Sequence, residues 1–366
     1  FALCGAWNGL GSDSATVIKT DANGNQQWQS VFLPTPGRAV AQDLLQVSDG
    51  SIIVCGFTGQ SSTPDGFITK LNTSGIAVWQ KVIGGASADD FMGMAEVNGN
   101  GFILCGKTSS FSMSSDFYVV RTDSNGDTLW TRHPGTTINE ESYDVVCTQD
   151  GGFAAFGDEY MTGGDALLVK LNSSGTQQWM QTYDGGGREL GRSLVETWDG
   201  GFALCGRKEN PANSNHMWLF RTDGSGTFMW DRTYPSALMS EGDDMHSTSD
   251  GGFVIAGGDN NSSGDMGQAY LVKTENAGWV NVPKIVLVEN DFIFAQDVNN
   301  NTITFTFADA IARKILRITD VEGRLVYHAE VGDISSVISI SDFAGGVYLY
   351  SVLTAEEMIG SGKFVK

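Results

Sequence analysis

Six basic residues recur at one spacing along the chain and are its most regular candidates for chemistry. They are Lys19, Lys70, Arg121, Lys170, Arg221 and Lys273. A ring of such cations could bind an anionic ligand. Buried charges need partners, however, and the chain carries 43 Asp and Glu against 22 Lys and Arg. We therefore predict ion pairs with acidic residues on neighbouring strands, such as Glu141, Glu189 or Glu241, and keep the cationic ring as the alternative.

A second candidate is the turn at residues 123–127, where oxygen-bearing side chains stand at alternate positions. Asp123, Asn125 and Asp127 are spaced as in a calcium loop, but the bidentate Glu that closes an EF-hand is absent. The corresponding turns at residues 72–75 and 172–175 carry Asn, Thr and Ser. Asx turns with glycine at positive φ explain all of these segments. We expect no cofactor, and calcium at these three residues is the alternative.

No group of residues has the spacing of a known catalytic centre. The four histidines match neither a metal site nor a catalytic triad, and no nucleophile elbow or phosphate loop is present. Adjacent acids such as Asp89-Asp90 and Asp243-Asp244 cannot converge, because neighbouring residues of a strand point to opposite faces. We predict no catalytic residue and a protein that is not an enzyme.

These residues are carried by an internal repeat of 49 to 51 residues, which extends from Phe1 to about Pro283. Each of six copies contains a Phe-x-x-x-Gly segment, with Ile in place of Phe once, ending at Gly5, Gly56, Gly106, Gly157, Gly206 and Gly257. Each copy also contains a tryptophan at one position: Trp28, Trp79, Trp130, Trp179, Trp230 and Trp279. A repeat of this kind indicates a structural unit that stacks on copies of itself.

One copy, residues 141–183, reads as four antiparallel strands joined by Asp-Gly-Gly and Ser-Ser-Gly turns. Its third strand is apolar on both faces, with Ala166 and Leu168 on one side and Leu167, Val169 and Leu171 on the other. Such a sheet must be covered twice, as in the blades of a β-propeller. We predict an all-β fold with a propeller of about six four-stranded blades, and an open β-solenoid as the alternative. The first copy is incomplete at its N-terminus, so we expect six blades, or seven if a whole unit lies upstream.

Composition restricts the environment and the partners. The net charge of −21 and the pI of about 4.4 disfavour nucleic acid and anionic membranes. No run of about 18 apolar residues is present, so we do not expect a membrane-embedded chain. Of five cysteines, four share one apolar repeat position, and we predict buried free thiols there: Cys4, Cys55, Cys105 and Cys205.

The 50-residue pattern stops after Pro283, and six or seven short strands follow in residues 284–366. We predict two domains, a propeller at residues 1–283 and a small Ig-like β-sandwich at residues 284–366. The second segment contains Ile318-Thr-Asp-Val-Glu-Gly323-Arg, then Ala344-Gly-Gly346-Val-Tyr348, and ends in Gly362-Lys363-Phe-Val-Lys. It resembles the type A C-terminal sorting domain of the type IX secretion system of Bacteroidota. By this resemblance Gly323, Gly346, Tyr348 and Lys363 belong to the sorting motif.

The repeat is also similar to the Asp-Gly-Gly-Phe and Gly-x-x-x-Trp units of large surface proteins of that phylum. The resemblance implies export through the type IX machinery to the cell surface or the medium. We expect a binding or structural protein, such as an adhesin, a scaffold or a subunit of an extracellular assembly. Its partners would be the secretion machinery, further copies of itself as an oligomer or filament, or a surface glycan or protein. The alternative is a carbohydrate-active hydrolase or lyase with carboxylates from different blades converging roughly 5 to 10 Å apart in the propeller mouth.

Overall fold

The computed structural model describes the chain except residues 9–12, 61, 160–163, 210–214, 235–238, 261–267, 275–287, 290–291, 298–300, 308–313, 322, 332–334 and 355–357. Every regular element in the described part is a β-strand, so the fold is all-β. No described helix has the length and apolarity to cross a bilayer. The chain forms two compact units, Phe1–Met245 with Gly258–Gly267, and His246–Gly257 with Gln268–Lys366. The predicted boundary at residues 283 and 284, and Trp279, lie outside the described residues.

Antiparallel sheets of successive strands follow one another along the repeat. The first has three strands, β1 (Ala2–Trp7), β2 (Ser14–Thr20) and β3 (Gln26–Phe32). Four-stranded sheets follow: β4 (Arg38–Gln46), β5 (Ile52–Gln60), β6 (Thr63–Leu71) and β7 (Ala77–Ile83); then β8 (Asp89–Glu96), β9 (Phe102–Thr108), β10 (Asp116–Thr122) and β11 (Thr128–Arg132).

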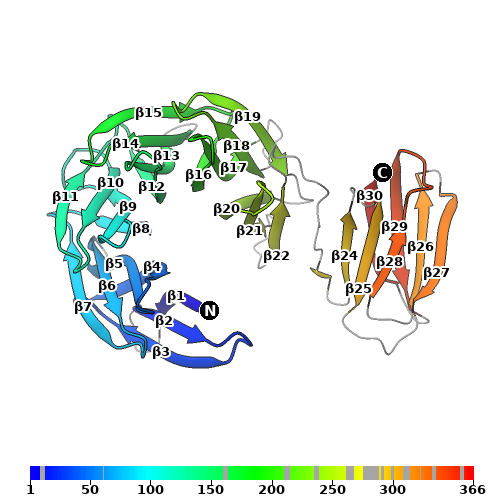
Figure 1. Ribbon diagram of the computed structural model, residues 1–366, viewed down its shortest axis with the longest axis horizontal. Coiled ribbons are helices and arrows are strands. Elements are labelled where there is room, and N and C mark those ends of the chain that lie inside the picture. Colours follow the sequence, from blue (N-terminus) through cyan, green and yellow to red (C-terminus); the bar gives the residue numbers. More distant parts are fainter. Residues whose placement is uncertain are drawn as a thin grey trace. The chain divides into compact units, whose positions relative to one another are not determined.

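The series continues with two further four-stranded sheets and one of three strands. They are β12 (Glu140–Cys147), β13 (Phe153–Glu159), β14 (Ala166–Leu171) and β15 (Gln177–Tyr183); β16 (Glu189–Glu196), β17 (Phe202–Glu209), β18 (Asn215–Thr222) and β19 (Phe228–Tyr234); and β20 (Met239–Ser247), β21 (Phe253–Asn260) and β22 (Gln268–Lys273). In the first unit the sheets follow an arc, with β4, β8, β12 and β16 on its inner side and β7, β11, β15 and β19 on its outer side (Figure 1).

The central strands of a sheet that lies between two other sheets are buried on both faces, as the repeat predicts. All six residues of β14 are buried, and its side chains enter two separate cores. Leu167 and Val169 pack with Phe117 of the preceding sheet, whereas Leu168 packs with Phe220 of the following sheet. The hydrophobic effect therefore stabilises the stacking of sheets rather than any single sheet.

The repeated tryptophan has a defined role at these junctions. Trp79 on β7 covers Gly126, in the turn between β10 and β11 of the next sheet, so closely that a Cβ added at Gly126 would lie 2.7 Å from the ring. Gly126 also has φ 78°, a left-handed conformation that favours glycine. The same contact joins Trp28 to Gly75, Trp130 to Gly175 and Trp179 to Gly226.

A β-bulge in each inner strand provides a second link between sheets. After the bulge of β12, the Asp144 carboxylate accepts hydrogen bonds from Leu194 N and Ser193 Oγ of the next sheet, both at 2.9 Å. Asp43 accepts one from Met94 N at 2.9 Å in the same way. Burial raises the pKa of Asp43 to about 6. The aspartate that follows the bulge therefore points toward the neighbouring sheet.

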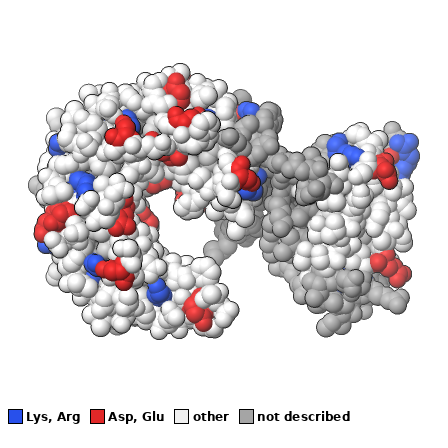
Figure 2. Space-filling model, in the orientation of Figure 1, with Lys and Arg blue, Asp and Glu red and all other residues white. Residues whose placement is uncertain are grey.

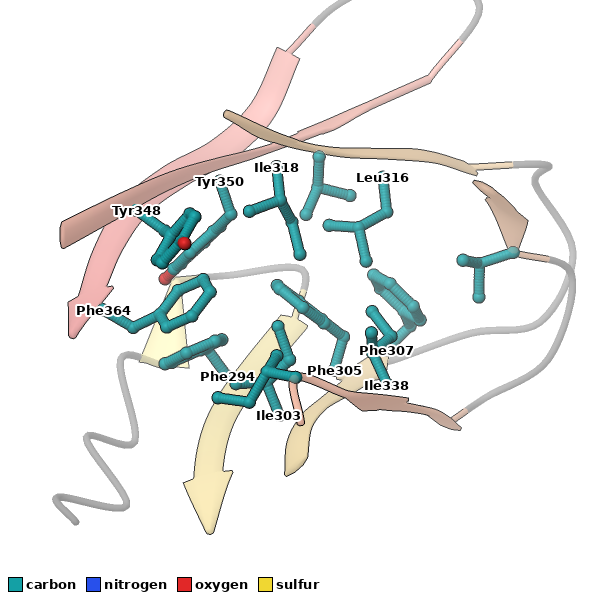
Figure 3. Close-up of a cluster of buried hydrophobic side chains, with 13 residues drawn as sticks. Phe294, Ile303, Phe305, Phe307, Leu316, Ile318, Ile338, Tyr348, Tyr350 and Phe364 are labelled. Atoms are coloured by element: carbon teal, nitrogen blue, oxygen red, sulfur yellow. The ribbon is translucent and has the colours of Figure 1, made fainter. Parts of the chain in front are cut away.

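The remaining strands form two four-stranded sheets. One contains β23 (Val288–Glu289), β24 (Phe292–Asp297), β25 (Thr302–Phe307) and β28 (Ser335–Ser339); the other contains β26 (Lys314–Asp320), β27 (Leu325–Val331), β29 (Val347–Leu353) and β30 (Met358–Val365). Their apolar side chains point toward one another in a common core (Figure 3), in which Phe294 and Phe305 of the first sheet contact Tyr350 of the second.

The residues of the predicted sorting motif lie at the turns and strands of these two sheets. Gly323, with φ 81°, lies in the turn between β26 and β27. Gly346 exchanges backbone hydrogen bonds with Lys366. Tyr348 is buried in the core and donates its hydroxyl to Ala344 O at 2.8 Å. Lys363 lies in β30, opposite Leu349.

Candidate functional site

A pocket of about 410 Å³ opens between sheet β8–β11 and sheet β12–β15. Its volume lies in the range of small-molecule sites, roughly 300 to 1,000 Å³. The lining residues are mostly polar: Lys107, Ser109, Met113, Ser114, Ser115, Asn139, Glu140 and Glu141. Many hydroxyl, amide and charged groups in one pocket suit a ligand rich in hydrogen-bonding groups.

Two carboxylates from different sheets meet at Lys107, one of the residues that line this pocket. Lys107 Nζ lies 2.8 Å from Glu141 Oε1, on β12, and 3.5 Å from Asp90 Oδ2, on β8. Lys107 therefore holds two carboxylates from different sheets side by side. Acidic side chains also gather along the inner margin of the first unit (Figure 2).

The three groups differ in their proton affinity. Burial raises the pKa of Asp90 to about 6, although Lys107 opposes the shift. Burial alone would lower the pKa of Lys107, but the charges of Asp90 and Glu141 raise it. Near neutral pH, Lys107 is thus charged, and the Asp90 carboxyl exchanges its proton close to the working range of a general acid or base.

A third carboxyl group, Asp158, lies directly across from Glu141 in the pairing of β12 with β13. Asp158 is completely buried, and neither of its carboxylate oxygens has a hydrogen-bond partner. Burial raises the pKa of Asp158 to about 7, with Arg192 opposing and Glu141 adding to the shift. Asp158 therefore carries a proton below about pH 7.

An aromatic and cationic group continues the site along the inner strands. The Arg192 guanidinium lies 4.2 Å above the ring of Tyr143 and donates to Glu241 Oε1 at 2.5 Å. Arg207 is 3.3 Å from the other oxygen of Glu241. Burial raises the pKa of the Tyr143 hydroxyl, and the charge of Asp158 adds to the effect. Tyr143 and Arg192 are the extra residues of the bulges in β12 and β16.

The six repeated basic residues are not brought together at this site. Four of them pair with the aspartate of the first hairpin turn of their own sheet: Lys70 with Asp49 at 2.9 Å, Lys170 with Asp150 at 2.8 Å, Arg221 with Asp199 at 2.8 Å, and Lys273 with Asp250 at 2.7 Å. Arg121 donates to backbone carbonyls, including Asn100 O at 2.8 Å. No ion pair of Lys19 occurs among the described residues.

The prediction that Glu141 and Glu241 pair with these basic residues is therefore wrong. Glu141 pairs with Lys107, and Glu241 pairs with Arg192 and Arg207. The physical reason is proximity, because the hairpin aspartate lies in the same sheet as the basic residue.

The loop proposed for calcium uses its carboxylates within the protein. Asp123 Oδ1 accepts hydrogen bonds from Asn125 N at 2.8 Å and Asp127 N at 2.9 Å. Asp127 forms an ion pair of 2.6 Å with Lys81 of the preceding sheet. This is the geometry of an Asx turn, and calcium binding at this loop stays a prediction.

Asp90, Glu141 and Glu241 were not recognised as a set from the sequence. They occupy one position of the repeat, since each lies 16 residues before the glycine that ends its Phe-x-x-x-Gly segment, at Gly106, Gly157 and Gly257. A comparison of the copies position by position would have found this signal. Asp89 and Asp90 have different partners, as predicted: Asp89 accepts from Ser110 Oγ at 2.7 Å, whereas Asp90 faces Lys107.

No family model and no curated protein sequence matches the chain. Solved structures do match it in fold. An ulvan lyase from a new family of polysaccharide lyases, bound to -[GlcA(1-4)Rha3S]-, gives a TM-score of 0.50 at 11% identity over 72% of this chain and 71% of the lyase chain. The fold is propeller-like.

Two further structures extend this comparison. The periplasmic gluconolactonase PpgL of Pseudomonas aeruginosa gives a TM-score of 0.48 at 13% identity over 92% of this chain and 98% of that chain. PorZ, a surface component of the type IX secretion system of Porphyromonas gingivalis, gives a TM-score of 0.42 at 11% identity over 98% of this chain. This chain spans 50% of the length of PorZ.

The prediction that the protein is not an enzyme is not supported. The matching structures include a polysaccharide lyase. A propeller-like fold therefore accommodates catalysis.

Proposed function

We propose that the propeller-like unit is a carbohydrate-active hydrolase or lyase that binds a glycan in the pocket at Lys107 and Glu141. The observation that carries the proposal is the convergence of Asp90 and Glu141, from two different sheets, on Lys107 at a polar pocket. Acid–base cleavage of a glycan requires proton-transferring groups fixed around a site of sugar size.

The pocket suggests a role for each group. Glu141 lines the pocket, and its ion pair with Lys107 places a positive charge there that would suit an acidic sugar. In a hydrolase, Glu141 would attack the sugar carbon and the Asp90 carboxyl would protonate the leaving oxygen. In a lyase, Glu141 would remove the proton next to the sugar carboxylate, whose charge Lys107 would neutralise. A carbon–carbon double bond would then form as the bond to the leaving oxygen breaks, and the Asp90 carboxyl would protonate that oxygen.

The finer architecture and the location belong to the same proposal. We infer about six blades, a small C-terminal β-sandwich, and export to the cell surface or the medium by the type IX secretion system. Support comes from the sorting-like motif, whose Tyr348 side chain and Gly323 turn lie in the two C-terminal sheets. The secretion machinery is then a partner, and the glycan is the substrate.

The test is a panel of neutral and uronate-containing polysaccharides incubated with the whole chain. New reducing ends measure cleavage of either kind, and ultraviolet absorbance of unsaturated uronates identifies a lyase. We expect Glu141→Gln and Asp90→Asn to lower the rate by at least about 100-fold. Asp231→Asn is the matched control, since Asp231 forms a similar ion pair with Lys208, at 2.9 Å, away from the pocket.

Two outcomes would refute the proposal. One is binding of a glycan without cleavage of any member of the panel. The other is a rate that Glu141→Gln leaves at the level of the Asp231→Asn control.

A further inference from the structure

Three carboxylates meet where sheet β12–β15 adjoins sheet β16–β19. Asp165 precedes β14, Asp184 follows β15, and Glu189 is the first residue of β16. The pairing of Ala166 with Tyr183 brings the first two side by side. One oxygen atom from each of the three lies within 4.8 Å of the other two. The cluster therefore joins three segments of two neighbouring sheets.

Glu189 has an unsatisfied atom in this cluster. Its side chain is completely buried, and Oε2 has no hydrogen-bond partner. Its other oxygen accepts from Gly187 N at 3.2 Å. A buried acceptor without a partner loses its hydration without compensation, which is rare in folded proteins. This atom points to a ligand that supplies positive charge.

No ion pair to these three carboxylates is found in the described part of the chain. Lys208 lies across from Glu189 in the pairing of β16 with β17, but its Nζ is bound to Asp231 at 2.9 Å. Burial raises the pKa of Glu189, and the charges of Asp165 and Asp184 add to the effect.

An earlier junction offers an internal comparison. Asp89, the first residue of β8, occupies the position of Glu189. Its carboxylate is satisfied by Gly85 N at 2.6 Å, by Ser110 Oγ at 2.7 Å and by the hydroxyl of Thr108. Hydroxyl donors thus satisfy Asp89 at the earlier junction, whereas a further carboxylate, Asp184, stands at the later one.

We propose that Asp165, Asp184 and Glu189 bind a calcium ion that links the two sheets. All three ligands are hard oxygen donors, as calcium prefers. Two ligands of one ion are separated by at most twice the ligand distance, about 5.2 Å for Ca²⁺ and about 4.2 Å for Mg²⁺. The limit of 4.8 Å on the separations in the cluster lies below this value for calcium and above it for magnesium. Water and backbone carbonyls complete the coordination of the calcium ion.

The test is calcium titration of the whole, chelator-treated protein by isothermal calorimetry, with thermal unfolding in parallel. We expect one calcium per chain at this site and a higher melting temperature with calcium than with chelator. Asp184→Asn and Asp165→Asn should each weaken binding at least tenfold while the protein remains folded. Asp123→Asn is the matched control, because it alters the turn at residues 123–127 and leaves the cluster intact.

The outcomes separate the two sites and are independent of glycan cleavage. The proposal is overturned if the wild-type protein binds no calcium, or if Asp165→Asn/Asp184→Asn binds it as tightly as wild type. Loss of binding in Asp123→Asn alone would also overturn it, by assigning the ion to the turn. Magnesium at the same concentration should not raise the melting temperature.

Discussion

The contact between tryptophan and glycine at each junction allows a quantitative test of sheet stacking. We consider Gly126→Ala in the turn covered by Trp79. Gly126 has φ 78°, and left-handed backbone costs a residue with a Cβ about 1 to 2 kcal/mol. The new methyl group would also lie 2.7 Å from Trp79 Cζ3, and overpacking typically costs about 1 to 3 kcal/mol. We expect the free energy of unfolding to fall by about 2 to 5 kcal/mol.

Gly24 provides the matched control in the same protein. It occupies the corresponding turn of the first sheet with φ 82°, and an added Cβ there has no atom within 4 Å. Gly24→Ala should therefore cost only the backbone strain, about 1 to 2 kcal/mol. Urea unfolding followed by circular dichroism measures both variants. In a Trp79→Ala background, the cost of Gly126→Ala should fall to that of Gly24→Ala.

This reasoning is refuted if Gly24→Ala and Gly126→Ala destabilise the protein equally. It is also refuted if the cost of Gly126→Ala is the same with and without the Trp79 ring. Either result would mean that the contact between the sheets adds nothing to the strain of the turn.

Two further predictions concern buried titratable groups. Burial raises the pKa of Asp158 to about 7, whereas the same group in the unfolded chain loses its proton above about pH 4. Because the folded state holds the proton more tightly, the contribution of Asp158 to the free energy of unfolding falls as pH rises from about 4 to 7. Asp158→Asn should therefore stabilise the protein at pH 8 and leave it nearly unchanged at pH 4 in thermal melts; equal effects at both values would contradict this. The thiols of Cys55, Cys105 and Cys205 are completely buried, and burial raises their pKa. A thiol reagent should therefore label at most two of the five cysteines in the native protein and all five in denaturant. Labelling of more than two thiols in the native protein would contradict the structure.

The sequence carried enough information to predict the sheets of the repeat, because its period and turns are local properties. The copy at residues 141–183 shows this: the four predicted strands appear as β12–β15, and the apolar residues of the third strand enter two cores. The bulges were missed, since an extra residue in β12 leaves no mark in composition or spacing.

The candidate site was harder to predict, since its residues meet only when sheets stack. Asp90 and Glu141 are separated by one repeat and converge on Lys107 across a junction. The predicted ion-pair partners of the repeated basic residues were wrong because the true partners lie close by, in the same sheet. Lys170 finds Asp150 at the turn of its own sheet, a closer neighbour than any glutamate of the next sheet.

At four described junctions a sheet presents a tryptophan to the following sheet, which covers the tryptophan with a glycine turn, so these junctions have a direction and share one contact. A duplication or loss of one whole repeat in the gene would therefore recreate a fitting junction at the point of recombination, with no compensating substitution. A deletion of half a repeat would leave a tryptophan without its glycine. Such arrays can change in length only by complete units, and a new pocket can arise at a single junction while the others keep the chain folded.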